Sequence, residues 1–143
     1  MKTDYFKMTF SSLPVNESFA RSLVGVYALR LNPSVSEISD IKTAVSEAVT
    51  NSIVHGYPDT VGEIALEGYV DGDVLHINVF DRGVGIENVS EALEPFYTTK
   101  SEEERSGMGF TIMQSFMDEV KVESARGSGT KVYMLKKLGI DAK

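Results

Sequence analysis

The beginning of the chain alternates between apolar and polar residues. In "YFKMTF" (5–10), Phe6, Met8 and Phe10 fall on one side of an extended chain, and this period of two predicts a half-buried strand. Alternation or short apolar runs predict four further strands, at 63–70, 74–81, 119–125 and 130–137. Asp71-Gly72 separates the second strand from the third and is typical of a tight hairpin turn.

Apolar residues at helical spacing predict three helices. The first lies within 13–31, with an apolar stripe of Phe19, Leu23, Val26 and Leu29 or Arg30. The second runs from about Val35 to His55 and has a buried stripe of Ile38, Ile41, Val45, Ala48 and Ile53. The third covers 109–117, with an apolar face of Ile112, Met113, Phe116 and Met117.

The second helix has a start signal and a stop signal. Ser34 and Glu37 have the spacing of a capping box. Gly56 is placed as a C-cap, and Pro58 follows it. We therefore expect a well-defined helix between these two points.

Residues 83–109 are charged, contain glycines and show no sustained period beyond a short helix near Val89 to Leu93. A loop this long inside a compact domain is usually functional, and we interpret it as a lid. The order strand, helix, helix, strand, strand, lid, helix, strand, strand predicts an α/β sandwich. Its sheet is expected to be mostly antiparallel, with helices on one face, in a single domain spanning 1–143.

Composition narrows the possible functions. No apolar run approaches the roughly 18 residues of a membrane span, and no signal peptide opens the chain, so we expect a cytoplasmic protein without a membrane partner. The absence of cysteine excludes thiolate nucleophiles and Cys-based zinc sites. A net charge of −7 argues against nucleic-acid binding. A nucleotide remains possible, because one phosphate site needs only local positive charge.

Two polar residues stand inside the second predicted helix. Glu47 and Asn51 are four positions apart, so they lie on one face of the helix and point to the same region. Either they form a solvated stripe or they face a ligand. The hard ion Mg²⁺ prefers oxygen ligands, which the side-chain oxygen of Asn51 could supply, and Glu47 could act as a base for a serine nucleophile.

Three glycine clusters complete the candidate chemistry: "DRGVGI" (81–86), "RSGMGF" (105–110) and "RGSGT" (126–130). Each one alone is a weak signal, because glycine also serves turns. The dinucleotide-binding fingerprint fails, since Asn88 and Ile112 stand where it needs a third glycine. The information lies in the order of the motifs along the chain.

In that order, "EAVTNSIVHG" (47–56), "DRGVGI", "GMGF" and "GT" resemble the GHKL (Bergerat-fold) superfamily, which includes histidine-kinase catalytic domains, Hsp90, gyrase-type topoisomerases and MutL. The chain is more closely similar to the small serine-kinase anti-sigma factors, in particular the anti-sigma F group of sporulating bacteria. "NESFAR" (16–21), "PFYTTK" (95–100) and "ERSGMGFTIMQSFMDEVKVES" (104–124) carry this resemblance. It covers nearly the whole chain, apart from the hairpin around Asp71 and the last few residues.

The resemblance implies that ATP or ADP binds with Mg²⁺, the metal at Asn51 and Glu47 as the catalytic base. It implies that Asp81 accepts a hydrogen bond from the exocyclic amine of adenine. Gly83 and Gly85, which follow Asp81 in the chain, would then lie close to the base, with Thr130 nearby. The phosphate-binding residues are then Gly107, Met108 and Gly109 at a helix start. Lys100 and Arg105 could neutralise the β- and γ-phosphates, or they could belong to a solvated charge run.

The implied function is that of an ATP-dependent protein serine/threonine kinase and anti-sigma factor. Its partners would be RNA polymerase sigma factor F, a STAS-type anti-anti-sigma factor and a second copy of the chain, bound near the first strand and helix. Glu17 and Arg21 would contact a partner, or form an exposed charged pair. Three alternatives stay open: a nucleotide-gated binding module without kinase activity, an anti-sigma B relative, and a histidine-kinase, Hsp90 or gyrase ATPase fragment.

Overall fold

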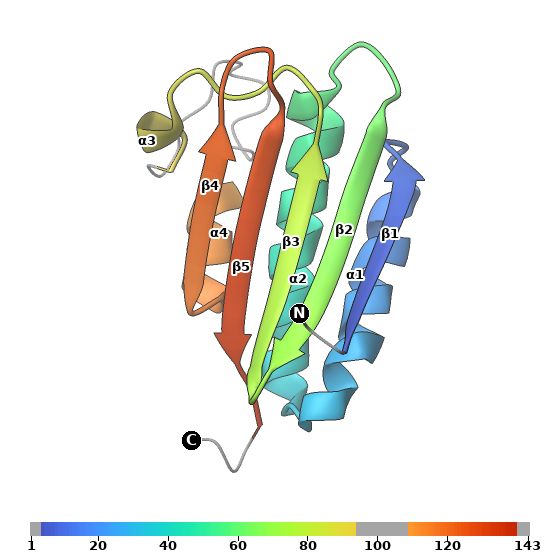
Figure 1. Ribbon diagram of the computed structural model, residues 1–143, viewed down its shortest axis with the longest axis vertical. Helices are drawn as coiled ribbons and strands as arrows, with labels where there is room; N and C mark the ends of the chain where they lie inside the picture. Colours follow the sequence, from blue (N-terminus) through green and yellow to red (C-terminus); the bar gives the residue numbers. More distant parts are fainter. Residues whose placement is uncertain (1–3, 94–108, 140–143) are drawn as a thin grey trace.

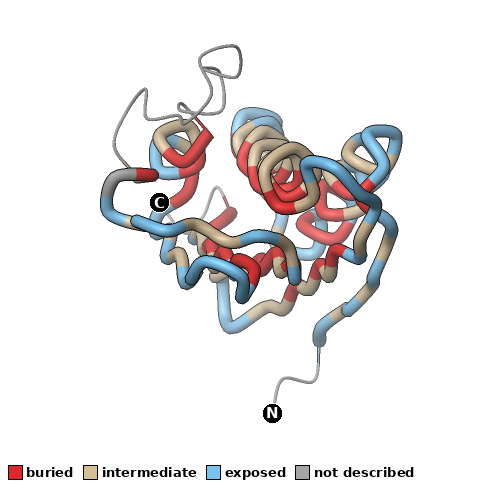
Figure 2. Tube along the Cα trace, turned by 90° about the horizontal axis from the view of Figure 1, so that it is seen from above, coloured by how far each residue is buried: buried red, intermediate tan, exposed pale blue. Residues whose placement is uncertain are grey.

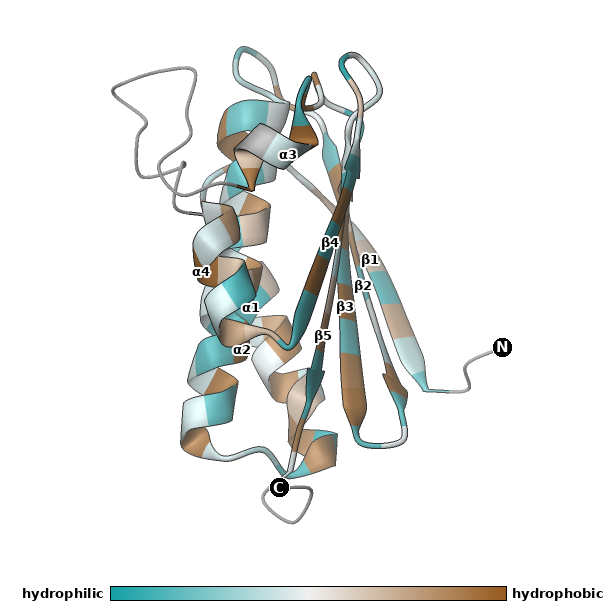
Figure 3. Cartoon of the chain, turned by 90° about the vertical axis from the view of Figure 1, so that its left-hand side faces the viewer, coloured by the Kyte–Doolittle hydropathy of each residue, from teal (hydrophilic) through white to brown (hydrophobic). Residues whose placement is uncertain are grey.

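A computed structural model describes residues 4–93 and 109–139 of the chain. The described residues form two layers, a five-stranded sheet and a set of helices that covers one of its faces (Figures 1 and 3). This is the α/β sandwich that the order of elements predicts. Within these residues, no helix is both long enough and apolar enough to cross a bilayer.

The strands of the sheet are those that the alternation predicts. They lie in the order β1-β2-β3-β5-β4, and each neighbouring pair of described strands is antiparallel. Asp81 on β3 stands opposite Thr130 on β5, and Thr130 stands opposite Ser124 on β4. The strand bounds are Tyr5–Ser11 (β1), Glu63–Asp71 (β2), Val74–Asp81 (β3), Glu119–Ser124 (β4) and Thr130–Lys137 (β5).

The helical layer holds α1 (Asn16–Ala28), the short 3₁₀ turn η1 (Leu29–Leu31), α2 (Val35–Asn51) and its π-helical continuation η2 (Ser52–Gly56). It also holds α3 (Val89–Ala92) and α4 (Gly109–Phe116). The predicted capping box is confirmed: Ser34 Oγ accepts from the Glu37 N–H at 3.1 Å, and the Ser34 N–H donates to Glu37 Oε1 at 2.9 Å.

The predicted extent of the second helix agrees with the structure, but its last turn is not α-helical, and the C-cap is Tyr57 rather than Gly56. The α-helix ends at Asn51, and a wider π turn continues to Gly56. This turn lets the Ser52 hydroxyl reach Asp81 and the Gly56 carbonyl reach the Val84 N–H. Tertiary bonds therefore determine the end of the helix, and turns of this kind are frequent at functional sites.

The predicted apolar stripe of the first helix faces the core only at Leu23, which is half-buried against it. Phe19, Val26 and Leu29 are 52%, 65% and 54% exposed, whereas small residues face the core together with Tyr27. These small residues allow a close approach between α1 and α2, since a Cβ on Gly25 would lie 3.1 Å from the Lys42 side chain. The buried positions of α1 are Ala20, Val24, Gly25, Tyr27 and Ala28.

The other two apolar faces are partly as predicted. On α2, Ile41, Val45 and Ala48 are buried, but Ile38 is only half-buried, as is Ile53 on η2. On α4, Met113 is buried and Met117 follows it into the core, but Ile112 and Phe116 are half-buried. Buried residues gather between the sheet and the helices (Figure 2), so one core joins the two layers.

A polar and aromatic cluster ties the start of the chain to α1. The Tyr27 hydroxyl donates to Asp4 Oδ1 at 2.8 Å, and Arg30 Nη1 donates to the same oxygen at 2.7 Å. The Arg30 guanidinium also lies 3.8 Å from the centre of the Tyr27 ring. Burial, followed by the hydrogen bond to Asp4, raises the pKa of Tyr27 to about 12.

The raised pKa predicts a loss of stability in strong base. The unfolded chain releases the Tyr27 proton near pH 10, whereas the folded chain keeps it to about pH 12, so the free energy of unfolding should fall between these values. Below pH 10 the free energy of unfolding of wild type should exceed that of Tyr27→Phe by about 1 kcal/mol, the net value of one hydrogen bond. This difference should decrease as the pH rises from 10 to 12. Urea unfolding across this range measures it.

The matched control is Tyr5→Phe, because Tyr5 is 55% exposed on β1. It should keep the wild-type pH profile. A Tyr27→Phe difference that stays constant from pH 9 to pH 12 would contradict the link between this cluster and stability.

Candidate functional site

A cavity of about 430 Å³ lies between the C-terminal end of α2, the end of β3 and the start of β5. The residues that line it include Asp81 at the end of β3 and Thr130 at the start of β5, and Figure 1 shows that α2 points its C-terminal end towards the same end of the sheet. Most of its wall is apolar, with a few polar groups, which is typical of a site for a small molecule. The apolar wall includes Ala48, Val84, Ile86, Ala92, Phe110 and Val132, and the polar groups include Asn51, Ser52, His55, Asp81, Glu87, Arg126 and Thr130.

Asp81 lies at the floor of this cavity and is 7% exposed. Its Oδ2 accepts from the Ser52 hydroxyl at 2.7 Å. Its Oδ1 accepts from the N–H groups of Gly83 at 2.9 Å and Thr130 at 3.2 Å. A carboxylate offers about four lone-pair positions, so Oδ2 retains acceptor capacity for a ligand donor.

Gly83 and Gly85 bring the chain after β3 against two neighbouring segments. A Cβ on Gly83 would overlap the Gly56 carbonyl, to which the Val84 N–H donates at 2.9 Å. Gly85 has φ +78°, and a Cβ there would overlap the Ala125 carbonyl. Both glycines therefore have a packing role, Gly85 in the cavity wall and Gly83 next to it.

Thr130 completes the adjoining part of the wall through Ser124. The two hydroxyls lie 2.8 Å apart, and Ser124 Oγ also accepts from the Ile86 N–H at 2.7 Å and donates to the Gly129 carbonyl at 2.8 Å. Because Ser124 has one hydroxyl hydrogen, Thr130 is the donor to Ser124. The oxygen of Thr130 then keeps acceptor capacity at the cavity.

The sequence patterns did not identify Ser52 and Ser124, which hold Asp81 and Thr130 in place. One signal was available for Ser124, since the strand register places it opposite Thr130. Ser52 follows Asn51 directly, but its direction depends on the π turn, which no periodicity indicates.

Glu47 and Asn51 both point to the start of α4. A Cβ at Gly109 would lie 3.0 Å from Asn51 Nδ2 and 3.4 Å from Glu47 Oε2. Asn51 also lines the cavity, and its Nδ2 is buried without an acceptor among the described residues. Asn51 therefore faces the cavity, and an unsatisfied amide fits a site that binds a ligand.

The remaining predicted residues do not line the cavity as described. Lys100, Arg105, Gly107 and Met108 lie outside the described residues. Glu17 and Arg21 lie on α1 and form an ion pair, with 3.0 Å between Arg21 Nε and Glu17 Oε2, and neither lines the cavity.

Among residues 4–93 and 109–139, no group of three or more His, Asp or Glu side chains could hold a metal ion. A Mg²⁺ ion at Asn51 would thus take most of its ligands from phosphates and water, as this ion commonly does. The residues present fit this kind of site.

Comparisons with known proteins agree with this geometry. The family model described as a histidine kinase-like ATPase domain matches residues 10–136. The anti-sigma F factor of Thermoanaerobacter sp. (strain X514) is 51% identical over 97% of this chain and 97% of its own length. The anti-sigma F factor of Clostridium acetobutylicum is 48% identical over 98% of both chains.

A crystal structure of the RsbU and RsbW domains of a Mycobacterium tuberculosis protein superposes with a TM-score of 0.67. The match covers 95% of this chain and 32% of that chain, at 20% identity, and therefore supports the fold alone.

The fold and the site thus define a histidine kinase-like ATPase domain, as the resemblance of the motifs predicted. With 51% identity over nearly its whole length, the chain belongs to the anti-sigma F factor family within this class.

The cavity geometry predicts that Ser52→Ala destabilises the fold. The variant removes one of the three donors to a buried carboxylate, which should lower the free energy of unfolding by about 1–3 kcal/mol. Ser18→Ala is the control, because its exposed hydroxyl contacts only the Val15 carbonyl, at 3.3 Å, in the described residues. Equal stability of the two variants in urea would show that the Ser52 bond contributes nothing.

Proposed function

We propose that this chain is an ATP-dependent protein-serine kinase that also acts as an anti-sigma factor. The observation that carries the proposal is the shared direction of Glu47 and Asn51. Both meet the first residue of α4 beside a cavity that ends on a buried carboxylate. A nucleotide could span these points with its base at one end and its phosphates at the other.

Asp81 would bind the adenine. Its remaining acceptor capacity on Oδ2 suits the exocyclic amine of adenine, whereas guanine would present a carbonyl oxygen to part of the same region. The bonds from Ser52, Gly83 and Thr130 hold the carboxylate in one orientation. This arrangement favours ATP and ADP over GTP, with Thr130 as a second polar group.

The phosphates would lie at the start of α4 and beside Asn51. Backbone N–H groups at a helix start favour anions, and Gly109 leaves space there, since a Cβ would lie only 3.0 Å from Asn51 Nδ2. Gly107, Met108, Lys100 and Arg105 are proposed from the sequence to complete this end. Mg²⁺, held through the Asn51 side-chain oxygen, would supply positive charge to the phosphates.

Glu47 would act as the general base. A serine hydroxyl of the partner protein would form the new oxygen–phosphorus bond as its proton passes to the Glu47 carboxylate. The bond between the γ-phosphorus and the bridging oxygen breaks, and ADP leaves. The protein's contribution is mainly to position the groups, which a rigid helix does well.

The regulatory part of the proposal rests on the relatives, which carry the name anti-sigma F factor. We propose that this chain binds RNA polymerase sigma factor F and phosphorylates a STAS-type anti-anti-sigma factor. Residues 1–143 would act as one domain in the cytoplasm, where sigma factors bind their polymerase.

A homodimer would use the exposed face of α1. Val15, Phe19, Val26 and Leu29 are between 52% and 71% exposed, and their spacing of four, seven and three residues places them along one stripe. Large exposed apolar groups on one face mark interaction sites. The Glu17–Arg21 ion pair on the same helix is proposed to contact a protein partner.

The kinase proposal predicts that Glu47→Gln blocks transfer. Incubation with labelled ATP and the STAS partner should label a serine in wild type. The variant should lower the rate by about 10²–10⁴-fold, the usual contribution of a general base. Its ATP affinity should change by less than about threefold, because the substitution removes an interaction of the transition state.

The control is Glu119→Gln, an exposed carboxylate at the start of β4, which should leave both quantities unchanged. Tight nucleotide binding by wild type without serine labelling would leave only a nucleotide-gated binding module.

The dimer proposal predicts that Val26→Asp yields a monomer. Val26 is 65% exposed, so the fold should tolerate the charge while the apolar interface should not. Light scattering after size exclusion measures the mass. Val61→Asp, at a 59% exposed position outside α1, should stay dimeric. A dimeric Val26→Asp protein would exclude this face of α1.

A further inference from the structure

Lys136 occupies a position on β5 where an apolar residue would be expected. Val132 and Met134 face the helices on the same side of the strand and are 3% and 1% exposed. Lys136 is next in this alternation, and its side chain is only 12% exposed. Lysine is seldom buried to this extent without a partner, so the contacts of its ammonium group need an explanation.

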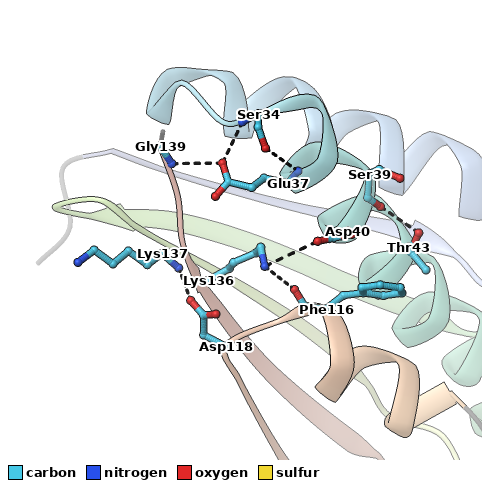
Figure 4. Close-up of polar contacts among 10 residues, drawn as sticks. All are labelled: Ser34, Glu37, Ser39, Asp40, Thr43, Phe116, Asp118, Lys136, Lys137 and Gly139. Carbon is cyan, nitrogen blue, oxygen red and sulfur yellow. Dashed lines mark hydrogen bonds and ion pairs between the residues drawn. The ribbon is translucent and has the colours of Figure 1, made fainter. Parts of the chain in front are cut away.

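Those contacts join three elements (Figure 4). Lys136 Nζ donates to the Phe116 carbonyl at 2.7 Å and lies 4.0 Å from Asp40 Oδ2 on α2. Phe116 is the last residue of α4, where carbonyl groups lack helical donors and a positive charge is favourable. One side chain thus holds the C-terminal end of α4 to β5 and places it beside α2.

The adjoining backbone adds to this attachment. The Asp118 N–H donates to the Leu135 carbonyl at 2.9 Å, and Asp118 Oδ2 accepts from the Lys137 N–H at 2.7 Å. Figure 4 shows the Lys137 side chain pointing away from α4 while Lys136 points to it. The two neighbouring lysines therefore differ in direction but not in charge.

The opposite end of α4 meets the proposed catalytic residues. Gly109 lies against Asn51 and Glu47, and the 8 residues of α4 span about 12 Å. Asp40 precedes Glu47 by seven residues on α2, so it lies on the same face about 10 Å away along the helix axis. The short helix α4 thus runs along this face of α2, from Asn51 and Glu47 at one end to Asp40 at the other.

We propose that Lys136 is a positioning residue for phosphoryl transfer. By holding the Phe116 carbonyl it determines where the first turn of α4 stands relative to Glu47 and Asn51. This inference rests on the proposed kinase function, because it assigns the first turn of α4 to the phosphates. Lys136 itself is too far from that end to touch a nucleotide there.

The test compares Lys136→Met with Lys137→Met, its matched control. Transfer to the STAS partner at saturating ATP should fall by about 10-fold or more in Lys136→Met, because a 1 Å misplacement can cost about 10²-fold. The dissociation constant for ADP should change by less than about threefold, since the adenine end is untouched. Lys137→Met should keep both values.

Two further variants separate positioning from general packing. Lys136→Arg keeps a cationic donor and should recover most of the rate. Asp40→Asn removes only the longer contact at 4.0 Å and should lower the rate by less than about threefold, as expected for a weak ion pair. A normal rate in Lys136→Met, or a parallel loss of rate and ADP affinity, would overturn the proposal.

If wild type transfers no phosphate, the kinase proposal is overturned, but the role of Lys136 in positioning α4 can still be tested. Amide hydrogen exchange in residues 109–117 then tests whether Lys136 positions α4. Faster exchange in the first turn of α4 in Lys136→Met than in Lys137→Met would support the positioning role of Lys136. Equal exchange in the two variants would overturn it.

Discussion

The buried carboxylate of Asp81 is the point where three separate segments meet. It binds the hydroxyl of Ser52 on the π turn, the N–H of Gly83 after β3 and the N–H of Thr130 on β5. Burying a carboxylate costs free energy unless donors bind it. These three bonds are therefore needed for Asp81 to be buried where the three segments meet. The same bonds orient the remaining acceptor capacity of Asp81 towards the cavity.

The other end of the site depends on the packing of α4 against α2. Glu47 and Asn51 both lie against the first residue of α4, Gly109, where a Cβ would press on the Asn51 amide. The far end of α4 is held by the bond from Lys136 to the Phe116 carbonyl. The site thus combines an end built on hydrogen bonds of the sheet, which we propose binds the base, with an end built on the placement of α4 against α2, which we propose binds the phosphates.

Local patterns predicted much of this architecture. The bounds of β3 and β5 and the capping box at Ser34 agree with the structure residue by residue. The face of α1 could not be predicted, because both of its faces are apolar and the buried one is made of small residues such as Ala20 and Ala28. Hydrophobicity favours the larger side chains, whereas close packing against α2 selects the smaller ones.

The π turn and the roles of Ser52 and Ser124 depend on contacts between residues distant in sequence, which no local period encodes. The sequence placed Asn51, Asp81 and Thr130 in one candidate site, and all three line the cavity. Their supporting hydrogen bonds could be found only from the fold.

The most direct test is a crystal structure of this chain with Mg²⁺ and an ATP analogue that cannot transfer its γ-phosphate. The account predicts the exocyclic amine of adenine on Asp81, the metal on the Asn51 side chain and the γ-phosphate beside Glu47. A nucleotide bound elsewhere, or one whose base lies away from Asp81 while Glu47 faces solvent, would contradict it.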